Sequence, residues 1–409
     1  MSTSNTLAKN IKKIMKRINI TLFALMLLGI LFSCTKASIN YTQNGNWVGR
    51  ATFPGQVMGF GVAFTIGEAA WVGTGINPQY PNQRLNTFFK YNPTYLPPPP
   101  YPSPTFYDST LGTWSKSATF PGPPRSNAVA FTVAGIGYVG TGVGNDGFTP
   151  LADFWAYNQA GNSWTQIDSL HDASGITQPR LDAAAWGFDT VGYVLTGTDN
   201  YNYFLDCWKY SPATGKWSTV PFLPGNPRSG ATTWVYNGKG YIMAGYTNSS
   251  NHAINNMAYD FWSFDPAKAA AGTLSPWSQL RDISNTSSGT YDDGYTNIVR
   301  KYGVGFTMAK TATGDKGYIT LGQNGTAVTY TWEYDFATDL WTEKTPYEGA
   351  ARREPLGLPW TTVVLSAPAS ARATRPPSRI SGNSSPTKSI TSSTNDIVVA
   401  KDFSGDFSG

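Results

Sequence analysis

The stretch that decides the fold is Pro124–Trp164, which contains PRSNAVAFTVAGIGYVGTG from Pro124 and LADFWAYNQAGNSW from Leu151. An Arg opens it and an apolar segment follows. A Gly-rich turn then leads to Tyr-Val-x-x-Gly, which is followed by Asp-Phe-Trp-x-Tyr, a short polar turn and a Trp. The alternation in AVAFTV has the period of a half-buried β-strand. We therefore expect this unit to be built from strands.

The same order of residues recurs along the chain. Three further copies begin with an Arg, and one earlier copy lacks the Arg but keeps the rest. The copies are Arg180–Trp217, Arg228–Trp277, Arg300–Trp341 and the earlier Gly59–Trp114. A period of about 50 to 75 residues indicates a repeat architecture in which each unit is one supersecondary block. Each block reads as four strands, with pairs such as Asn237-Gly238 supplying tight hairpin turns.

The run of Arg, apolar strand, Tyr-Val-x-x-Gly, Asp-Phe-Trp-x-Tyr and Asn-x-Trp resembles the kelch repeat. This resemblance covers residues 47–354 and implies an all-β, kelch-type β-propeller. One departure is visible, because the paired glycines of the family stand here as Thr-Gly, Ala-Gly or Leu-Gly. Trp47 precedes any opening strand and matches the closing Trp strand of the repeat. In kelch-like propellers such an N-terminal strand completes the last blade, which would remove a sheet edge.

The tail after Glu354 does not continue the repeat. If Pro355–Ala369 is read one base earlier with free choice of third bases, it allows AVGFAVDNRGFVGTG, which matches Ala128–Gly142 at nine of fifteen positions. In the same frame Arg379–Ser384 allows DIWKF. We therefore predict six intended blades, the last truncated by a frameshift, with residues 355–409 as an aberrant low-complexity tail. The alternative is a genuine disordered tail.

Residues 1–33 have the pattern of a lipoprotein signal peptide. A basic segment precedes an apolar run from Ile18 to Phe32, and Leu31-Phe32-Ser33-Cys34 resembles a bacterial lipobox. Acylation of Cys34 would anchor the chain to a membrane, and residues 34–46 would form a linker. We expect the protein in the bacterial cell envelope, at the outer membrane, with the periplasmic or the cell-surface side left open. The alternative is an ordinary signal peptide.

Charge and residue counts exclude several function classes. The leader holds five of the 30 basic residues and no acidic one, which leaves 25 basic against 25 acidic residues in the mature chain. This balance gives no support to nucleic-acid binding. There are two His residues and, besides Cys34, only Cys207, which stands at a core position of the repeat. The copper site of galactose-oxidase-like kelch proteins cannot be assembled from these, so we expect no cofactor and no metal.

Two sets of residues are candidates for ligand binding. An Arg recurs at one repeat position, which predicts a ring near the axis that either bonds backbone carbonyls or binds an acidic ligand. Loop tyrosines could stack on sugar rings. The candidates are Arg125, Arg180, Arg228, Arg300, Arg352, Tyr201 and Tyr203.

No GxSxG, HExxH or P-loop motif is present, so no catalytic residue is assigned. The leading interpretation is a monomeric, non-catalytic, membrane-anchored module that binds a glycan or a partner protein. One alternative is a carbohydrate-active enzyme resembling the sialic-acid mutarotases, which also use kelch propellers. Another is a structural subunit of an envelope complex that docks through the Pro-rich segment 93–106.

Overall fold

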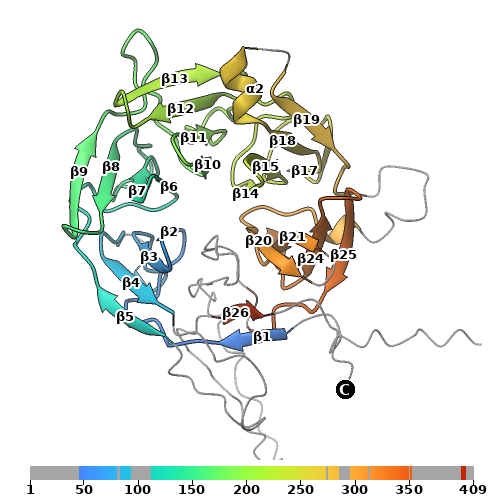
Figure 1. Cartoon of the computed structure of the whole chain (residues 1–409), viewed down its shortest axis with the longest axis horizontal. Coiled ribbons are helices and arrows are strands. Elements are labelled where there is room, and N and C mark those ends of the chain that lie inside the picture. Colours follow the sequence, from blue (N-terminus) through green and yellow to red (C-terminus); the bar gives the residue numbers. More distant parts are fainter. Residues whose placement is uncertain are drawn as a thin grey trace, which may run out of the picture. The chain divides into compact units, whose positions relative to one another are not determined.

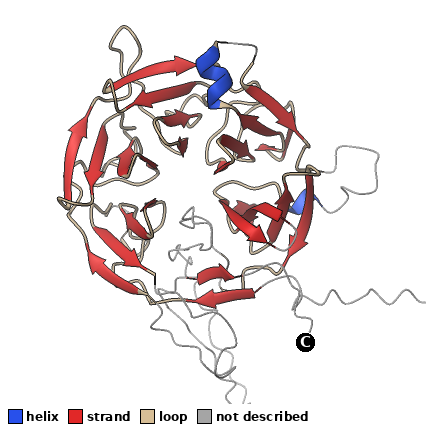
Figure 2. Cartoon of the chain, in the orientation of Figure 1, coloured by secondary structure: helices blue, strands red, loops and turns tan. Residues whose placement is uncertain are grey.

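A computed structural model describes residues 46–80, 83–93, 112–272, 275–284, 295–311, 314–349, 351 and 398–401. Within this part, five four-stranded antiparallel sheets follow one another in sequence and are arranged as a ring (Figure 1). The all-β, kelch-like propeller expected from the sequence is therefore confirmed, with five complete blades. Figure 2 shows how little helix the described residues contain, namely α2 (Pro266–Ala271) and the 3-10 helix η2 (Tyr295–Asn297).

Each blade consists of four strands in sequential order. Blade one contains β2 (Val62–Ile66), β3 (Ala69–Gly73), β4 (Phe88–Asn92) and β5 (Thr113–Lys116). Blade two contains β6 (Val129–Val133), β7 (Ile136–Gly140), β8 (Phe154–Asn158) and β9 (Ser163–Ile167). Blade three contains β10 (Ala184–Gly187), β11 (Gly192–Leu195), β12 (Cys207–Ser211) and β13 (Lys216–Val220). Blade four contains β14 (Thr232–Tyr236), β15 (Lys239–Met243), β18 (Phe261–Phe264) and β19 (Trp277–Leu280). Blade five contains β20 (Val304–Thr311), β21 (Gly314–Thr320), β24 (Thr331–Asp335) and β25 (Leu340–Lys344).

Three further pairs of strands complete the described structure. Two lie within the β15–β18 and β21–β24 connections, and the third joins the two ends of the described chain. The pairs are β16 (Ala253–Ile254) with β17 (Met257–Ala258), β22 (Gln323–Asn324) with β23 (Thr326–Ala327), and β1 (Asn46–Gly49) with β26 (Val398–Lys401). β1 and β26 lie between blade five and blade one (Figure 1).

The hairpin turns follow from the sequence. Asn237 and Gly238, between β14 and β15, have φ values of 46° and 70°. Positive φ at both central residues gives the turn whose twist matches that of paired strands. This places Trp234 opposite Tyr241 across the hairpin, where their rings stack at 5.9 Å. The β6–β7 hairpin repeats this arrangement with Phe131 and Tyr138, stacked at 5.1 Å.

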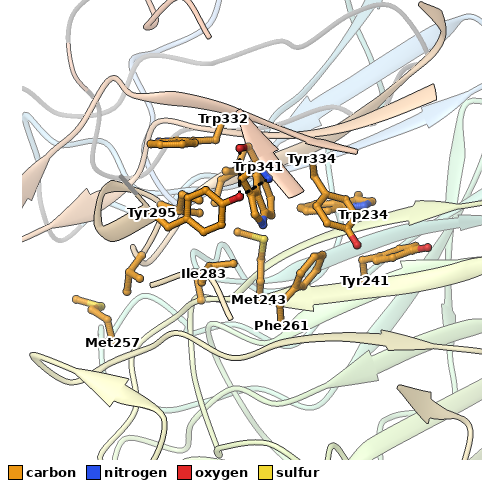
Figure 3. Packing of buried hydrophobic residues seen from close by; sticks show 14 residues of the cluster. Trp234, Tyr241, Met243, Met257, Phe261, Ile283, Tyr295, Trp332, Tyr334 and Trp341 are labelled. Atoms are coloured by element: carbon orange, nitrogen blue, oxygen red, sulfur yellow. Dashed lines mark hydrogen bonds between the residues drawn. The ribbon is translucent and has the colours of Figure 1, made fainter. Parts of the chain in front are cut away.

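The hydrophobic cores lie between blades. Figure 3 shows the cluster in which Trp234, Tyr241 and Phe261 of blade four meet Tyr334 and Trp341 of blade five. The hydroxyl of Tyr295, from the loop that joins these blades, accepts a hydrogen bond from the Trp341 backbone N–H at 2.9 Å. Large rings fill the wedge between twisted sheets, which explains why the aromatic residues recur at fixed repeat positions.

Part of the tail belongs to the fold, which the sequence did not predict. Residues 398–401 form β26 and pair with β1, although the sequence suggested that the whole of 355–409 falls outside the fold. An edge strand such as β1 presents unpaired N–H and C=O groups that accept another strand readily. The remaining part of the tail lies outside the described residues. Over the described part of the chain, no helix has the length and apolar character needed to span a membrane.

Candidate functional site

The two faces of the propeller carry different connections. Because neighbouring strands are antiparallel, the second-to-third-strand loops and the blade-to-blade loops lie on one face. We call this the loop face. Residues 246–258 connect β15 with β18, and the described parts of 281–299 connect β19 with β20. Both polar insertions are therefore on the same face, as expected from the sequence. The Pro-rich segment stands between β4 and β5 in the sequence, and its residues 94–106 lie outside the described part.

A central cavity of about 460 Å³ runs between the innermost strands of the five blades. None of its lining residues is charged. At two positions of each innermost strand, the residues that line the cavity are small or β-branched. The residue between them has a large ring that points into an inter-blade core. The first position is occupied by Ala63, Ala130, Ala185, Thr233 and Gly305, and the second by Thr65, Thr132, Gly187, Val235 and Thr307. The small residues keep the axis open, and the loop-face mouth supplies the polar groups.

A ring of five residues surrounds this mouth. One residue from each blade occupies the same position, two residues before the innermost strand, in left-handed backbone conformation. These are Phe60, Asn127, Asp182, Gly230 and Tyr302, with φ between 52° and 61°. In blades two to five, the backbone N–H of this residue donates to the carbonyl of its counterpart in the preceding blade, at 2.8 to 3.0 Å, from Asn127 to Phe60 through to Tyr302 to Gly230. This backbone chain holds the five residues around the axis.

Asp182 is the centre of a hydrogen-bond network at the mouth. Its Oδ1 accepts from Asn127 Nδ2 at 2.6 Å, and its Oδ2 accepts from the Tyr302 hydroxyl at 2.8 Å. Tyr302 reaches from blade five to blade three, and its ring also meets Phe60 edge-on at 5.2 Å. Burial raises the pKa of Asp182, while the two hydrogen bonds and the charge of Lys301 oppose that shift. The carboxyl is thus held in a half-buried site next to a phenol.

Aromatic and cationic groups extend the network outward. The Lys301 ammonium lies 5.3 Å from the ring centroid of Tyr302 and 5.4 Å from that of Tyr246. Tyr246 is in turn 5.5 Å from Tyr203, which is half-buried. Burial raises the pKa of Tyr203, so its hydroxyl remains a neutral donor and acceptor. One side of the mouth therefore combines a cation, three phenols and a carboxyl.

A second aromatic pair lies on the loop face at blades two and three. Tyr201 is 76% exposed and Phe148 is 56% exposed, and their rings meet edge-on at 6.2 Å. The Asn200 side chain ties the two loops together through a bond from Nδ2 to the Phe148 carbonyl at 2.7 Å. Exposed, fixed aromatic rings provide contact area at a low conformational cost. Of the two tyrosines predicted as ligand contacts, Tyr201 is thus freely accessible and Tyr203 lies nearer the network.

The recurring arginines have structural partners. The side chains of Arg125, Arg180, Arg228 and Arg300 are fully buried. The first three pair with the Asp of their own blade at 2.6 Å, namely Asp153, Asp206 and Asp260. Each also donates to backbone carbonyls, such as that of Thr141 for Arg125. A ligand cannot reach a guanidinium that is wholly buried and bonded within its blade. The ligand-binding interpretation of this ring is therefore corrected in favour of the structural one.

Blades one and five lack this Arg–Asp pair. In blade one, Met58 and Thr87 replace the Arg and the Asp. In blade five, Arg300 remains but Tyr330 takes the place of the Asp, and the guanidinium bonds only to backbone carbonyls. Burial without a carboxylate lowers the pKa of Arg300 to about 9. Trp332, whose counterparts donate to the Asp carboxylate, has no partner for its buried Nε1.

The remaining residues singled out in the sequence are two cysteines and Arg352. Cys207 is free and fully buried, as expected for a core position, and burial raises the pKa of its thiol. Cys34 and Arg352 lie outside the described residues. Among the described residues, no group of His, Cys, Asp and Glu could hold a metal ion.

The residues of the mouth were missed by the sequence analysis. Asn127 and Asp182 each stand two positions after the repeat's Arg, and so do Gly230 and Tyr302. Aligning the copies on the Arg would have brought these residues together in one column. Positions that stay the same between copies identify the repeat, whereas this candidate ligand site is formed at positions that vary.

Comparisons with known proteins support the fold alone. No family model matches the chain, and no curated protein matches it. Among solved structures, that of YjhT aligns with a TM-score of 0.55 at 16% sequence identity, covering 78% of this chain and 92% of that protein. At this level of identity the likeness concerns the arrangement of blades, and the chain is a kelch-like β-propeller.

Proposed function

We propose that this protein is a carbohydrate-binding module of the bacterial cell envelope that holds its ligand at the loop-face mouth of the propeller. The observation that carries the proposal is the Asp182 network at the end of an uncharged central cavity. Carboxyl, amide and phenol groups are the partners that sugar hydroxyls require, and aromatic faces take the apolar faces of sugar rings. The exposed pair Tyr201 and Phe148 on the same face extends this surface for a longer glycan.

A glycan array followed by titration calorimetry tests the proposal. Asp182→Asn and Tyr201→Ala each change one part of the surface, and both should weaken binding of any glycan that the array identifies. Tyr80→Ala is the matched control, because Tyr80 is also an exposed tyrosine, at 63%, and lies outside the network. The proposal would be wrong if all three variants bound with equal affinity, or if the wild-type protein bound no glycan.

A second candidate, catalysis on a sugar, is favoured by one observation. A carboxyl group with a raised pKa next to a phenol at a cavity mouth is an arrangement that can donate and accept protons. We infer that, if the protein is a carbohydrate-active enzyme, Asp182 is the acid–base group. Anomer exchange measured by NMR decides this. Exchange must rise above the solvent rate with wild-type protein and fall to that rate with Asp182→Asn.

We further propose that the chain is anchored through a lipid on Cys34. The support is the pattern of a basic segment, an apolar run and a Cys at residues 9–34. Expression in a bacterial host, detergent phase partitioning and mass spectrometry of the mature N-terminus test this. Wild-type protein should partition into the detergent phase, whereas Cys34→Ser should appear in the aqueous phase or as uncleaved precursor.

A further inference from the structure

Negative charge is concentrated in blades two and three. Residues 126–208 contain eight Asp, no Glu or Lys and a single Arg, which gives this segment a formal charge of −7. The rest of the chain from residue 34 onward holds 24 basic against 17 acidic residues, so its charge has the opposite sign. A ligand on these two blades therefore meets a negative potential wherever the carboxylates are not neutralised by cations of the protein itself.

Half of these eight carboxylates are directed to the loop face without a cationic partner. Three of the eight pair with cations, namely Asp153, Asp206 and Asp168. A fourth, Asp189, stands in the β10–β11 hairpin, on the face opposite to the loop face. The remaining four belong to loop-face connections and form no ion pair within the described chain. They are Asp146, Asp172, Asp182 and Asp199.

Two of these carboxylates stand directly beside the exposed aromatic pair. Asp146 Oδ1 accepts a hydrogen bond from the backbone N–H of Phe148 at 3.0 Å, and Asp199 Oδ1 accepts one from that of Tyr201 at 2.9 Å. The two ring centroids are 6.2 Å apart, and the bond from Asn200 to the Phe148 carbonyl holds the two loops together. The surface thus consists of two fixed rings with one carboxylate beside each.

Both carboxylates keep their negative charge at mildly acidic pH. Hydrogen bonds from Thr149 and Phe148 lower the pKa of Asp146 to about 2. Partial burial raises the pKa of Asp199, but the hydrogen bonds that this carboxylate accepts outweigh that effect and leave its pKa below the ordinary value. Arg84 of blade one attracts Asp146 but lies too far away to form an ion pair.

Rings flanked by carboxylates match one kind of sugar better than the others. An aromatic face takes the apolar face of a sugar ring and also attracts a cation, and a carboxylate forms a charge-assisted hydrogen bond with an ammonium group. A sugar acid would be repelled by the same carboxylates, and a neutral sugar would gain nothing from their charge. The charge of the surface therefore selects a positively charged glycan.

We propose that the glycan bound on the loop face is a hexosamine chain with free amino groups, whose ammonium groups are held by Asp146 and Asp199 next to the rings of Phe148 and Tyr201. This inference rests on the proposed carbohydrate-binding function and names the ligand class for it. Because the contacts are exposed ion pairs, the affinity depends on salt as well as on the sugar ring.

Titration calorimetry of the full chain with two sugar hexamers at about pH 5.5 tests the inference. The glucosamine hexamer and the N-acetylglucosamine hexamer have the same chain of rings, and only the first carries ammonium groups at this pH. The glucosamine hexamer should bind at least about tenfold more tightly, and its affinity should fall severalfold when NaCl is raised from about 50 mM to about 300 mM.

The variant Asp146→Asn with Asp199→Asn removes the two charges and keeps the side-chain oxygens that accept the turn hydrogen bonds. It should bind the glucosamine hexamer about tenfold more weakly and the N-acetylated hexamer as wild type does. Asp189→Asn is the matched control, because it removes an exposed carboxylate of the same two blades on the opposite face and should bind both hexamers as wild type does.

Three results would overturn the inference. These are equal affinity for the two hexamers, no binding of the glucosamine hexamer, and binding of hexalysine as tight as that of the glucosamine hexamer, which would show that any polycation suffices. If a different glycan bound in a manner that depends on Asp182 and Tyr201, the carbohydrate-binding function would stand and only the ligand class would be wrong. If the double variant fails to fold, the comparison of the two hexamers and hexalysine on the wild-type chain still decides the outcome.

Discussion

Tyr330→Asp in blade five would give Arg300 the carboxylate partner that it lacks. In blades two, three and four, one Asp receives both the buried guanidinium and the Nε1–H of the Trp two residues later. Blade five keeps the Arg and the Trp but has Tyr330 at the Asp position. The guanidinium is fully buried, and Trp332 Nε1 is a buried donor without a partner. The substitution should therefore satisfy two groups at once.

The size of the effect follows from the contacts. A hydrogen bond to a charged group contributes about 1.5–3 kcal/mol, and satisfying a buried orphan donor removes a cost of about 1–3 kcal/mol. Arg300 Nη2 already donates to the Asn297 carbonyl at 2.6 Å, so only one new guanidinium bond is counted. Loss of the Tyr330 ring, which is 39% exposed, costs at most about 2.5 kcal/mol in burial. We expect Tyr330→Asp to be about 3 kcal/mol more stable than Tyr330→Ala and about 1 kcal/mol more stable than wild type.

Equilibrium urea unfolding of the three proteins, monitored by Trp fluorescence, measures these differences. Comparison with Tyr330→Ala separates the gain of the carboxylate from the loss of the ring. Repeating the pair in an Arg300→Met background completes a double-mutant cycle, in which the advantage of Asp over Ala should fall by about half or more. If Asp and Ala at this position were equally stable in the wild-type background, the account of the Arg–Asp pair as a buried structural bond would be wrong.

Four other outcomes follow from the structure. Asp206→Ala leaves the buried Arg180 guanidinium without its carboxylate and should lower the free energy of unfolding by about 3–5 kcal/mol, measured by urea unfolding. Burial raises the folded-state pKa of Asp182, so its contribution to stability is present below the unfolded pKa of about 4 and is lost as pH rises through the folded pKa. The stability of wild type relative to Asp182→Asn should therefore decline from pH 4 upward, and a pH-independent difference would contradict the assignment. Tyr201→Ala should weaken glycan binding about tenfold by calorimetry while leaving the free energy of unfolding within about 0.5 kcal/mol of wild type, because the ring is exposed. Cys34→Ser should abolish detergent-phase partitioning of the processed protein, and retention in that phase would show that the anchor is elsewhere.

The sequence alone determined the architecture of this protein. Strand period, turn residues and the spacing of the Trp and Tyr anchors are local properties of the sequence. Because the unit is repeated five times, these signals recur five times and support one another. The position of Trp47 in the last blade was also readable, since it rests on likeness to the closing strand of each copy. The pairing of β26 with β1 was not, because Val398–Lys401 carries no repeat signal and its register depends on an edge elsewhere in the fold.

The candidate site was decided by the tertiary structure. The sequence indicated that an Arg recurring at one repeat position lies near the axis, but whether those guanidinium groups face a ligand or a partner within the protein depends on burial. The fold buries them against Asp153, Asp206 and Asp260. Asp182 and Tyr302 are 120 residues apart, and their contact across the mouth exists only because the ring brings blade three and blade five to a common axis. Periodic local signals fix the blades, whereas a site formed by different residues from different blades requires the closed geometry that places them together.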